Sequence, residues 1–113
     1  MSELIYINEE EGKKRVMNNA KLYVKLLGKF RDGTNLDNLL SFVSAEDWEN
    51  AQGAAHTIKG VAANLSLTEF YNQSLDVETQ LKGKSLNPES LEKLKSCFSQ
   101  TLAAIEEVIA KNA

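Results

Sequence analysis

Hydrophobic residues between positions 48 and 65 recur at alternating steps of three and four, the spacing of one face of an α-helix. This stripe consists of Trp48, Ala51, Ala55, Ile58, Ala62 and Leu65. On a helical wheel His56, the single histidine of the chain, lies roughly 130° from the centre of the stripe. The pattern therefore predicts a helix that buries one face and presents His56 to solvent.

Further helices are predicted on both sides from hydrophobic spacing and capping residues. Asn8, Asn19 and Asn87 stand where side-chain caps are expected, the last directly before Pro88. Ser44 opens a cap-like sequence before the His56 helix, and Ser66-Leu67-Thr68-Glu69 matches a capping box. The predicted helices span about 9–17, 20–33, 36–43, 45–65, 67–83 and 88–110.

Three of these helices carry clear apolar stripes outside the His56 helix. The stripes are Leu22, Leu26, Leu27 and Phe30; Leu67, Phe70, Ser74, Val77 and Leu81; and Leu91, Leu94, Phe98, Leu102, Ile105 and Ile109. Four long helices with short connections favour antiparallel neighbours. We therefore predict an all-α fold, an antiparallel four-helix bundle with one or two short accessory helices at its N-terminal side. Residues 1–113 are expected to form one domain.

Composition and charge restrict the partners of the chain. Its 113 residues carry a formal net charge of −3, and no block of lysine or arginine that would follow a phosphate backbone is present. No apolar run reaches the roughly 18 residues that a membrane span needs. A single cysteine, Cys97, cannot form an internal disulfide and fits a reducing compartment. We expect a cytoplasmic monomer that binds neither nucleic acid nor membrane.

The surroundings of His56 suggest that another molecule approaches its ring. Gly53 and Gly60 share the outward face with it, although glycine inside a helix costs about 1 kcal/mol relative to alanine. Lys59, at the edge of the buried stripe, can bring its ammonium beside the ring, which suits a negatively charged group such as a phosphoryl. Two alternatives remain: an incidental histidine, or glycines that let a neighbouring helix pack closely.

Glu78 is the predicted partner of His56 on the following helix. A turn near residues 65–66 places His56 level with roughly residue 75, and side chains tilt toward the N-terminus of their own helix, so the two tips converge. A carboxylate that accepts from Nδ1–H would fix the tautomer and leave Nε2 as the free lone pair. The alternative is that Glu78 is one of many solvated acidic residues.

The sequence lacks the residue patterns that other catalytic or binding sites need. One histidine and one distant cysteine cannot assemble a structural zinc site, and no glycine-rich phosphate loop or Gly-x-Ser-x-Gly elbow occurs. The acidic run Glu9-Glu10-Glu11 is interpreted as a solvated first helical turn. We expect no autonomous enzyme, and neither a metal nor a cofactor on this chain.

The segment Ala55-His56-Thr57-Ile58-Lys59-Gly60 resembles the central pattern of histidine-containing phosphotransfer (HPt) domains, Ala-His-x-Leu/Ile-Lys-Gly followed by small residues. The resemblance extends over most of the chain, including Leu-Leu-x-x-Phe at 26–30, Asp-Trp at 47–48 and Asp-Val-Glu at 76–78. Many family members have glutamine at the position of Glu78, and the chemotaxis-kinase branch has glutamate. Ser66 stands where the family usually has glycine.

The resemblance implies a phosphorelay in two-component signalling. His56 would be phosphorylated on Nε2 and exchange the phosphoryl group with aspartates of response-regulator receiver domains, fed by a hybrid sensor histidine kinase. Lys59 would stabilise the phosphoryl oxygens, Gly60 would clear space, and Mg²⁺ would belong to the receiver partner. Two alternatives stay open: an adaptor of the same fold that no longer uses its histidine, or an excised HPt domain of a hybrid kinase. The beginning of the chain favours a free-standing protein.

Overall fold

The computed structural model describes residues 6–34 and 36–112 as an all-helical chain, without a strand in this part. Its six helices are α1 (Glu9–Arg15), α2 (Ala20–Gly33), α3 (Asp37–Ser44), α4 (Trp48–Asn64), α5 (Thr68–Lys82) and α6 (Pro88–Lys111). The all-α prediction is thereby confirmed. Residues 1–5, 35 and 113 of the predicted domain, including Asn35 ahead of α3, lie outside the described residues.

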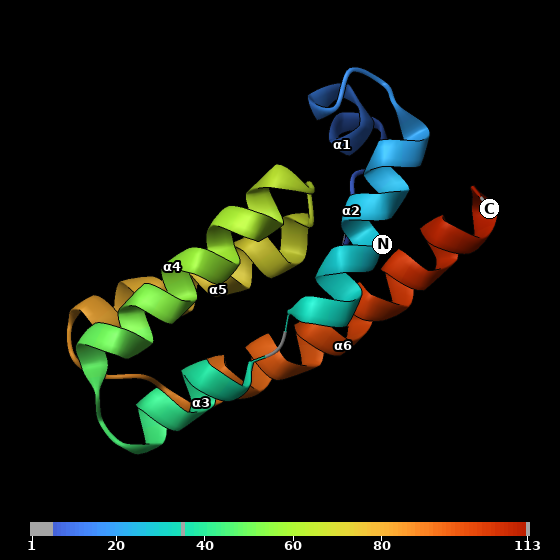
Figure 1. Cartoon of the computed structure of the whole chain (residues 1–113). Coiled ribbons are helices and arrows are strands. Elements are labelled where there is room, and N and C mark those ends of the chain that lie inside the picture. Colours follow the sequence, from blue (N-terminus) through green and yellow to red (C-terminus); the bar gives the residue numbers. More distant parts are fainter. Residues whose placement is uncertain (1–5, 35, 113) are drawn as a thin grey trace, which may run out of the picture.

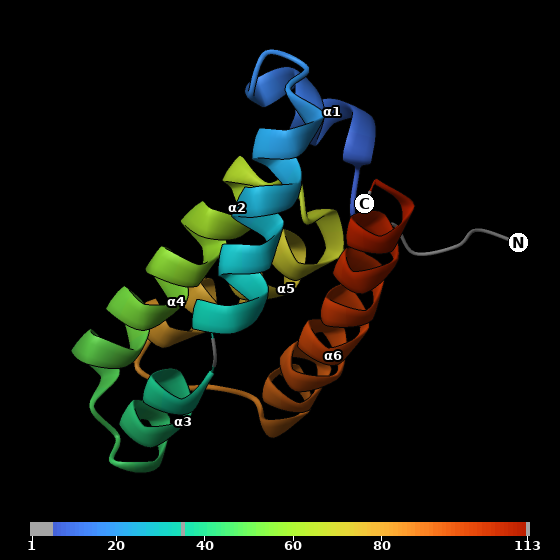
Figure 2. The same ribbon diagram turned by 45° about the vertical axis from the view of Figure 1, so that its right-hand side comes forward.

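The long helices α4 and α5 form a hairpin that is the centre of the fold. They pack against each other more extensively than any other pair, and both views in Figures 1 and 2 show them side by side. The other face of α5 contacts α6, which also packs against α2, whereas the short α3 covers α4. The hairpin therefore fixes which residues of α4 and α5 face one another.

Local capping chemistry sets most of the helix starts. Asn8, Asn19 and Asn87 cap α1, α2 and α6 as predicted, since each side chain accepts a backbone N–H of the first turn. The prediction that Ser44 opens α4 is wrong. Ser44 is the last residue of α3, and Asp47 caps α4 by accepting from the backbone N–H of Asn50.

The predicted capping box at Ser66 is also wrong. Leu67 occupies the N-cap position of α5 without a side-chain cap, whereas Ser66 has a φ of 57°, in the left-handed region that favours glycine. The Ser66 hydroxyl instead donates to Glu11 Oε1 at 3.0 Å, and its carbonyl accepts from Asn8 N at 2.8 Å. This serine thus joins the α4–α5 turn to α1.

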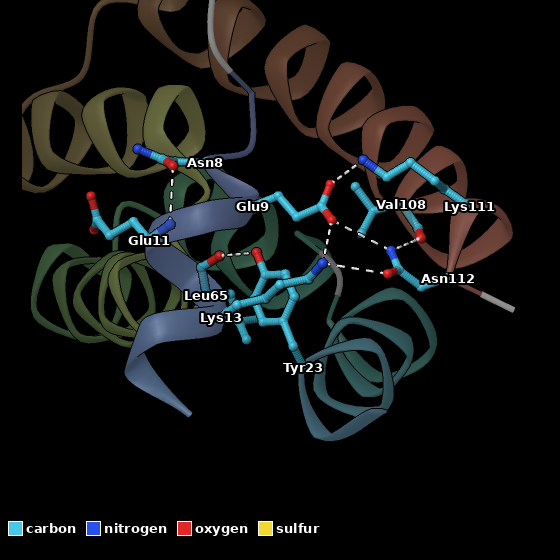
Figure 3. Close-up of polar contacts among 9 residues, drawn as sticks. All are labelled: Asn8, Glu9, Glu11, Lys13, Tyr23, Leu65, Val108, Lys111 and Asn112. Atoms are coloured by element: carbon cyan, nitrogen blue, oxygen red, sulfur yellow. Dashed lines mark hydrogen bonds and ion pairs between the residues drawn. The ribbon is translucent and has the colours of Figure 1, made fainter. Parts of the chain in front are cut away.

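A second contact holds the same turn from α2. The buried Tyr23 hydroxyl donates to the carbonyl of Leu65 at 2.8 Å, as Figure 3 shows. A Cβ on Gly12 would lie 2.4 Å from the Tyr23 ring, so only glycine lets α1 approach this closely. Tyr23 is fully buried although the predicted stripe of α2 contained Leu22 instead, which is 40% exposed.

The core otherwise follows the predicted stripes of α4 and α5. In α6 the buried line is displaced relative to the prediction. The residues of α6 that are buried are Leu94, Cys97, Thr101, Ile105 and Val108. The predicted Leu91, Phe98, Leu102 and Ile109 are half-buried along its border.

Glu9 is not the solvated residue that its acidic run suggested. It forms ion pairs with Lys13 at 2.7 Å and with Lys111 at the far end of the chain, and Asn112 donates to it as well (Figure 3). The hydrogen bond from Lys111, followed by that from Lys13, lowers the pKa of Glu9 to about 2. The start of α1 is thereby attached to the end of α6.

Candidate functional site

His56 lies on the outer side of α4, with its side chain 68% exposed. The neighbouring stripe residues Ala55 and Ile58 are buried. The helix therefore holds the imidazole in a defined place while leaving most of the ring accessible.

Glu78 of α5 contacts the ring from the side. Its Oε2 lies 2.9 Å from His56 Nδ1, and only 4% of the Glu78 side chain is exposed. The tilt of side chains on two antiparallel helices brings these tips together. A carboxylate can only accept, so the proton of this hydrogen bond belongs to Nδ1, and in the neutral imidazole Nε2 carries the free lone pair.

Lys59 of α4 contacts Glu78 at the other oxygen of the carboxylate. Its Nζ is 2.7 Å from Glu78 Oε1, and its side chain is only 20% exposed. Oε1 makes this ion pair but no well-aligned hydrogen bond. A carboxylate buried this deeply requires a counter-charge, and Lys59 supplies it. The ammonium is therefore bound to the same carboxylate that contacts the His56 ring.

The charge state of Glu78 follows from three competing effects. Burial is the largest and by itself raises the pKa, whereas the contacts with Lys59 and then His56 lower it. Together the two contacts outweigh burial, and the pKa of Glu78 lies below its usual value. Glu78 is thus a carboxylate at neutral pH and a permanent acceptor for Nδ1–H.

Gly53 and Gly60 border open space. A Cβ built on either residue meets no atom within 4 Å in the described part of the chain. The alternative that these glycines let a neighbouring helix pack closely is therefore wrong. The surface of α4 at these two positions is therefore open.

A surface depression of about 430 Å³ opens beside the ring, and we call it the His56 depression. It is lined by Glu49, Gln52, Gly53, His56, Glu78 and Lys82. Lys82 was not among the residues singled out from the sequence. Its position four residues after Glu78, on the same helix face, was the signal that could have identified it.

The arrangement provides an accessible imidazole nitrogen with a defined tautomer, which can attack an electrophile and carry a transferred group. Among the described residues, no group of three or more histidine, cysteine, aspartate or glutamate side chains is arranged to hold a metal ion. None of the helices in this part has the length and apolar character that crossing a membrane requires.

Comparison with known proteins identifies one family. The Hpt domain family model matches residues 30–108, which include α4, α5 and most of α6. No curated protein and no solved structure matches the chain significantly.

Proposed function

Because the chain belongs to the Hpt domain family, we propose that it is a phosphorelay intermediate whose His56 exchanges a phosphoryl group with receiver-domain aspartates. The single observation that carries this proposal is the contact between His56 Nδ1 and Glu78 on an otherwise exposed ring. It leaves Nε2, on the other side of the ring, as the nucleophile. Family membership supports the reaction class, and the geometry supports the assignment to Nε2.

The proposed transfer begins with an aspartyl phosphate on the receiver. The Nε2 lone pair attacks phosphorus, the P–O bond to the aspartate breaks, and its carboxylate leaves with the bonding electrons. The new P–Nε2 bond holds the phosphoryl group, while Nδ1–H continues to donate to Glu78. Donation to a second receiver is the reverse exchange. Such transfers depend mainly on positioning and on neutralising charge.

This chain contributes positioning more than covalent machinery. Glu78 orients the ring, Lys59 holds Glu78, and Gly60 leaves room for the partner next to His56. We propose that the long helices α2, α4, α5 and α6 form the antiparallel bundle that carries this site. With no nucleotide-binding motif in its sequence, the chain acts as a phosphocarrier and receives its phosphoryl group from a hybrid sensor histidine kinase or a receiver.

The Mg²⁺ and acidic residues needed for the aspartyl phosphate belong to the receiver partner. We propose that the carrier is cytoplasmic and monomeric, so that one exposed face of α4 serves several partners in turn.

Incubation with a phosphorylated receiver domain tests the proposal. We expect an acid-labile phosphoryl label on this chain and its absence from the His56→Ala variant. If the chain binds the receiver but acquires no label, or if the His56→Ala variant is labelled equally, the chain is a non-transferring adaptor.

A further inference from the structure

Two lysines lie near His56, and the structure gives them different surroundings. Lys59 is bound to Glu78, whereas Lys82 is exposed and forms no ion pair in the described part of the chain. We propose that Lys82 is the cation that contacts the phosphoryl group on His56, and that Lys59 acts only through Glu78. This inference rests on the proposed function.

The charges around His56 favour a contact between the phosphoryl group and a cation other than Lys59. At 2.7 Å the Lys59 ammonium and the Glu78 carboxylate form an internally neutral pair, whose combined field falls off quickly with distance. A phosphoryl group on Nε2 adds about two negative charges next to this pair. The charge of the Lys59 ammonium is already balanced by Glu78, so the pair adds no net positive charge against them. An unpaired cation nearby would supply that charge.

The position of Lys82 in the α4–α5 hairpin also favours this contact. The contact between His56 and Glu78 sets the register of the antiparallel hairpin, and one turn further from the connection Gln52 and Lys82 line the same depression. His56 leans toward the N-terminus of α4, and therefore toward the level of Lys82. Lys82 leans toward the N-terminus of α5, and therefore toward Glu78 and the ring. Both side chains line the His56 depression.

The other groups in the His56 depression do not replace Lys82. Glu49 lies two turns before His56 on α4 and carries a negative charge that would repel a phosphoryl group. The Gln52 amide can donate a hydrogen bond but supplies no charge. Lys82 is therefore the only cation that lines the His56 depression among the described residues. Its long flexible side chain can follow the phosphoryl group as it arrives and leaves.

Phosphoramidate permits a test without a protein partner. In this reaction Nε2 attacks phosphorus, the P–N bond of phosphoramidate breaks, and ammonia leaves with the bonding electrons and its protons. We would compare Lys82→Gln, Lys82→Arg and Lys59→Gln with the wild-type protein. Lys93→Gln is the matched control because this exposed lysine of α6 does not line the His56 depression. Circular dichroism would verify that each variant is folded.

We expect Lys82→Gln to slow labelling and shorten the lifetime of the phosphohistidine by roughly tenfold, as for the loss of one charge-assisted hydrogen bond. Lys82→Arg should restore most of both, and added salt should reduce the difference. Lys59→Gln should instead change the ¹⁵N chemical shift of Nδ1 in the unphosphorylated protein, because it alters Glu78.

Different results overturn different parts of the account. If wild-type protein is labelled but Lys82→Gln and Lys93→Gln behave alike, the assignment of Lys82 is wrong while His56 remains the phosphoacceptor. If Lys59→Gln shortens the phosphohistidine lifetime without shifting Nδ1, Lys59 contacts the phosphoryl group itself. If wild-type His56 takes no label from phosphoramidate or a receiver, the proposed function fails and this inference fails with it.

Discussion

Replacing Lys59 by methionine removes the counter-charge of Glu78 while keeping most of the apolar stem. Breaking a buried ion pair by removing one partner costs about 3–5 kcal/mol. Glu78 is almost fully buried, but Lys59 is 20% exposed and His56 still donates to the carboxylate. We therefore expect Lys59→Met to lower the free energy of unfolding at pH 7 by about 2–3 kcal/mol, slightly below that range.

The loss of unfolding free energy caused by Lys59→Met should decrease at low pH. The pKa of Glu78 is lowered in the folded protein, so its contribution to stability is present above its ordinary pKa and is lost as pH falls through the folded value. Once Glu78 is protonated it carries no charge, so the Lys59 ammonium no longer stabilises it as a counter-charge. The difference in unfolding free energy between wild type and Lys59→Met should therefore shrink as the solution is acidified below the ordinary carboxyl range.

Urea denaturation followed by circular dichroism measures these differences. A double-mutant cycle with Glu78→Gln isolates the ion pair, since glutamine keeps an acceptor for His56 Nδ1–H without a charge. We expect a coupling energy of about 2 kcal/mol between the two substitutions at pH 7. A coupling energy below about 0.5 kcal/mol would show that the ion pair is no stronger than a solvated surface pair.

Two further predictions concern residues with contrasting surroundings. Gly60→Gln should keep or slightly raise helix stability, because its side chain meets open space and glycine is a poor helix former. It should nevertheless slow phosphotransfer between a receiver and His56 at least tenfold, because the receiver needs the open face. Labelling by the small donor phosphoramidate should stay within about threefold of the wild-type rate. Equal receiver rates in wild type and variant would refute this role of Gly60. Glu9→Gln should lower the unfolding free energy by about 1 kcal/mol at pH 7, since two ion pairs to partly exposed lysines are lost. The pKa of Glu9 is about 2, so this difference should vanish as pH falls from the ordinary carboxyl pKa toward that value; a difference that persists below pH 2 would contradict the assignment.

Helix starts and buried helix faces were predicted correctly where the sequence offered a single cap residue or a single hydrophobic stripe. The asparagine caps and the stripe on α4 lie as expected. At Ser44 and Asp47, two cap residues stand three positions apart, and local sequence cannot decide which one ends the preceding helix. In α6 the predicted stripe keeps the helical spacing, but a choice by residue type alone took Phe98 and Leu102 where the buried positions are held by Cys97 and Thr101.

The site was predictable to the extent that it depends on periodicity. The outward position of His56 and its meeting with Glu78 follow from helix geometry and a tight turn. The burial depth of Glu78 depends on packing that no short pattern reports. Consequently the sequence could not indicate that Lys59 would be held by Glu78, whereas the spacing of Lys82 from Glu78 could have pointed to the His56 depression.

Ion pairs between residues far apart in the chain could not be predicted from the sequence either. Glu9 and Lys111 stand more than a hundred positions apart and meet only because α1 folds onto the end of α6. Ser66 illustrates the same limit, because its unusual φ is accompanied by contacts with Asn8 and Glu11 from a different helix. Long-range geometry has to be known before such contacts can be assigned.

The central claim is that His56 carries the phosphoryl group on Nε2 because Glu78 occupies Nδ1. Nitrogen-15 and phosphorus-31 NMR of the protein labelled by a phosphorylated receiver identifies the ring nitrogen bonded to phosphorus. The account predicts a P–Nε2 bond, with Nδ1 still protonated and hydrogen-bonded to Glu78. A P–Nδ1 bond, or a phosphoryl group on any other residue, would contradict it.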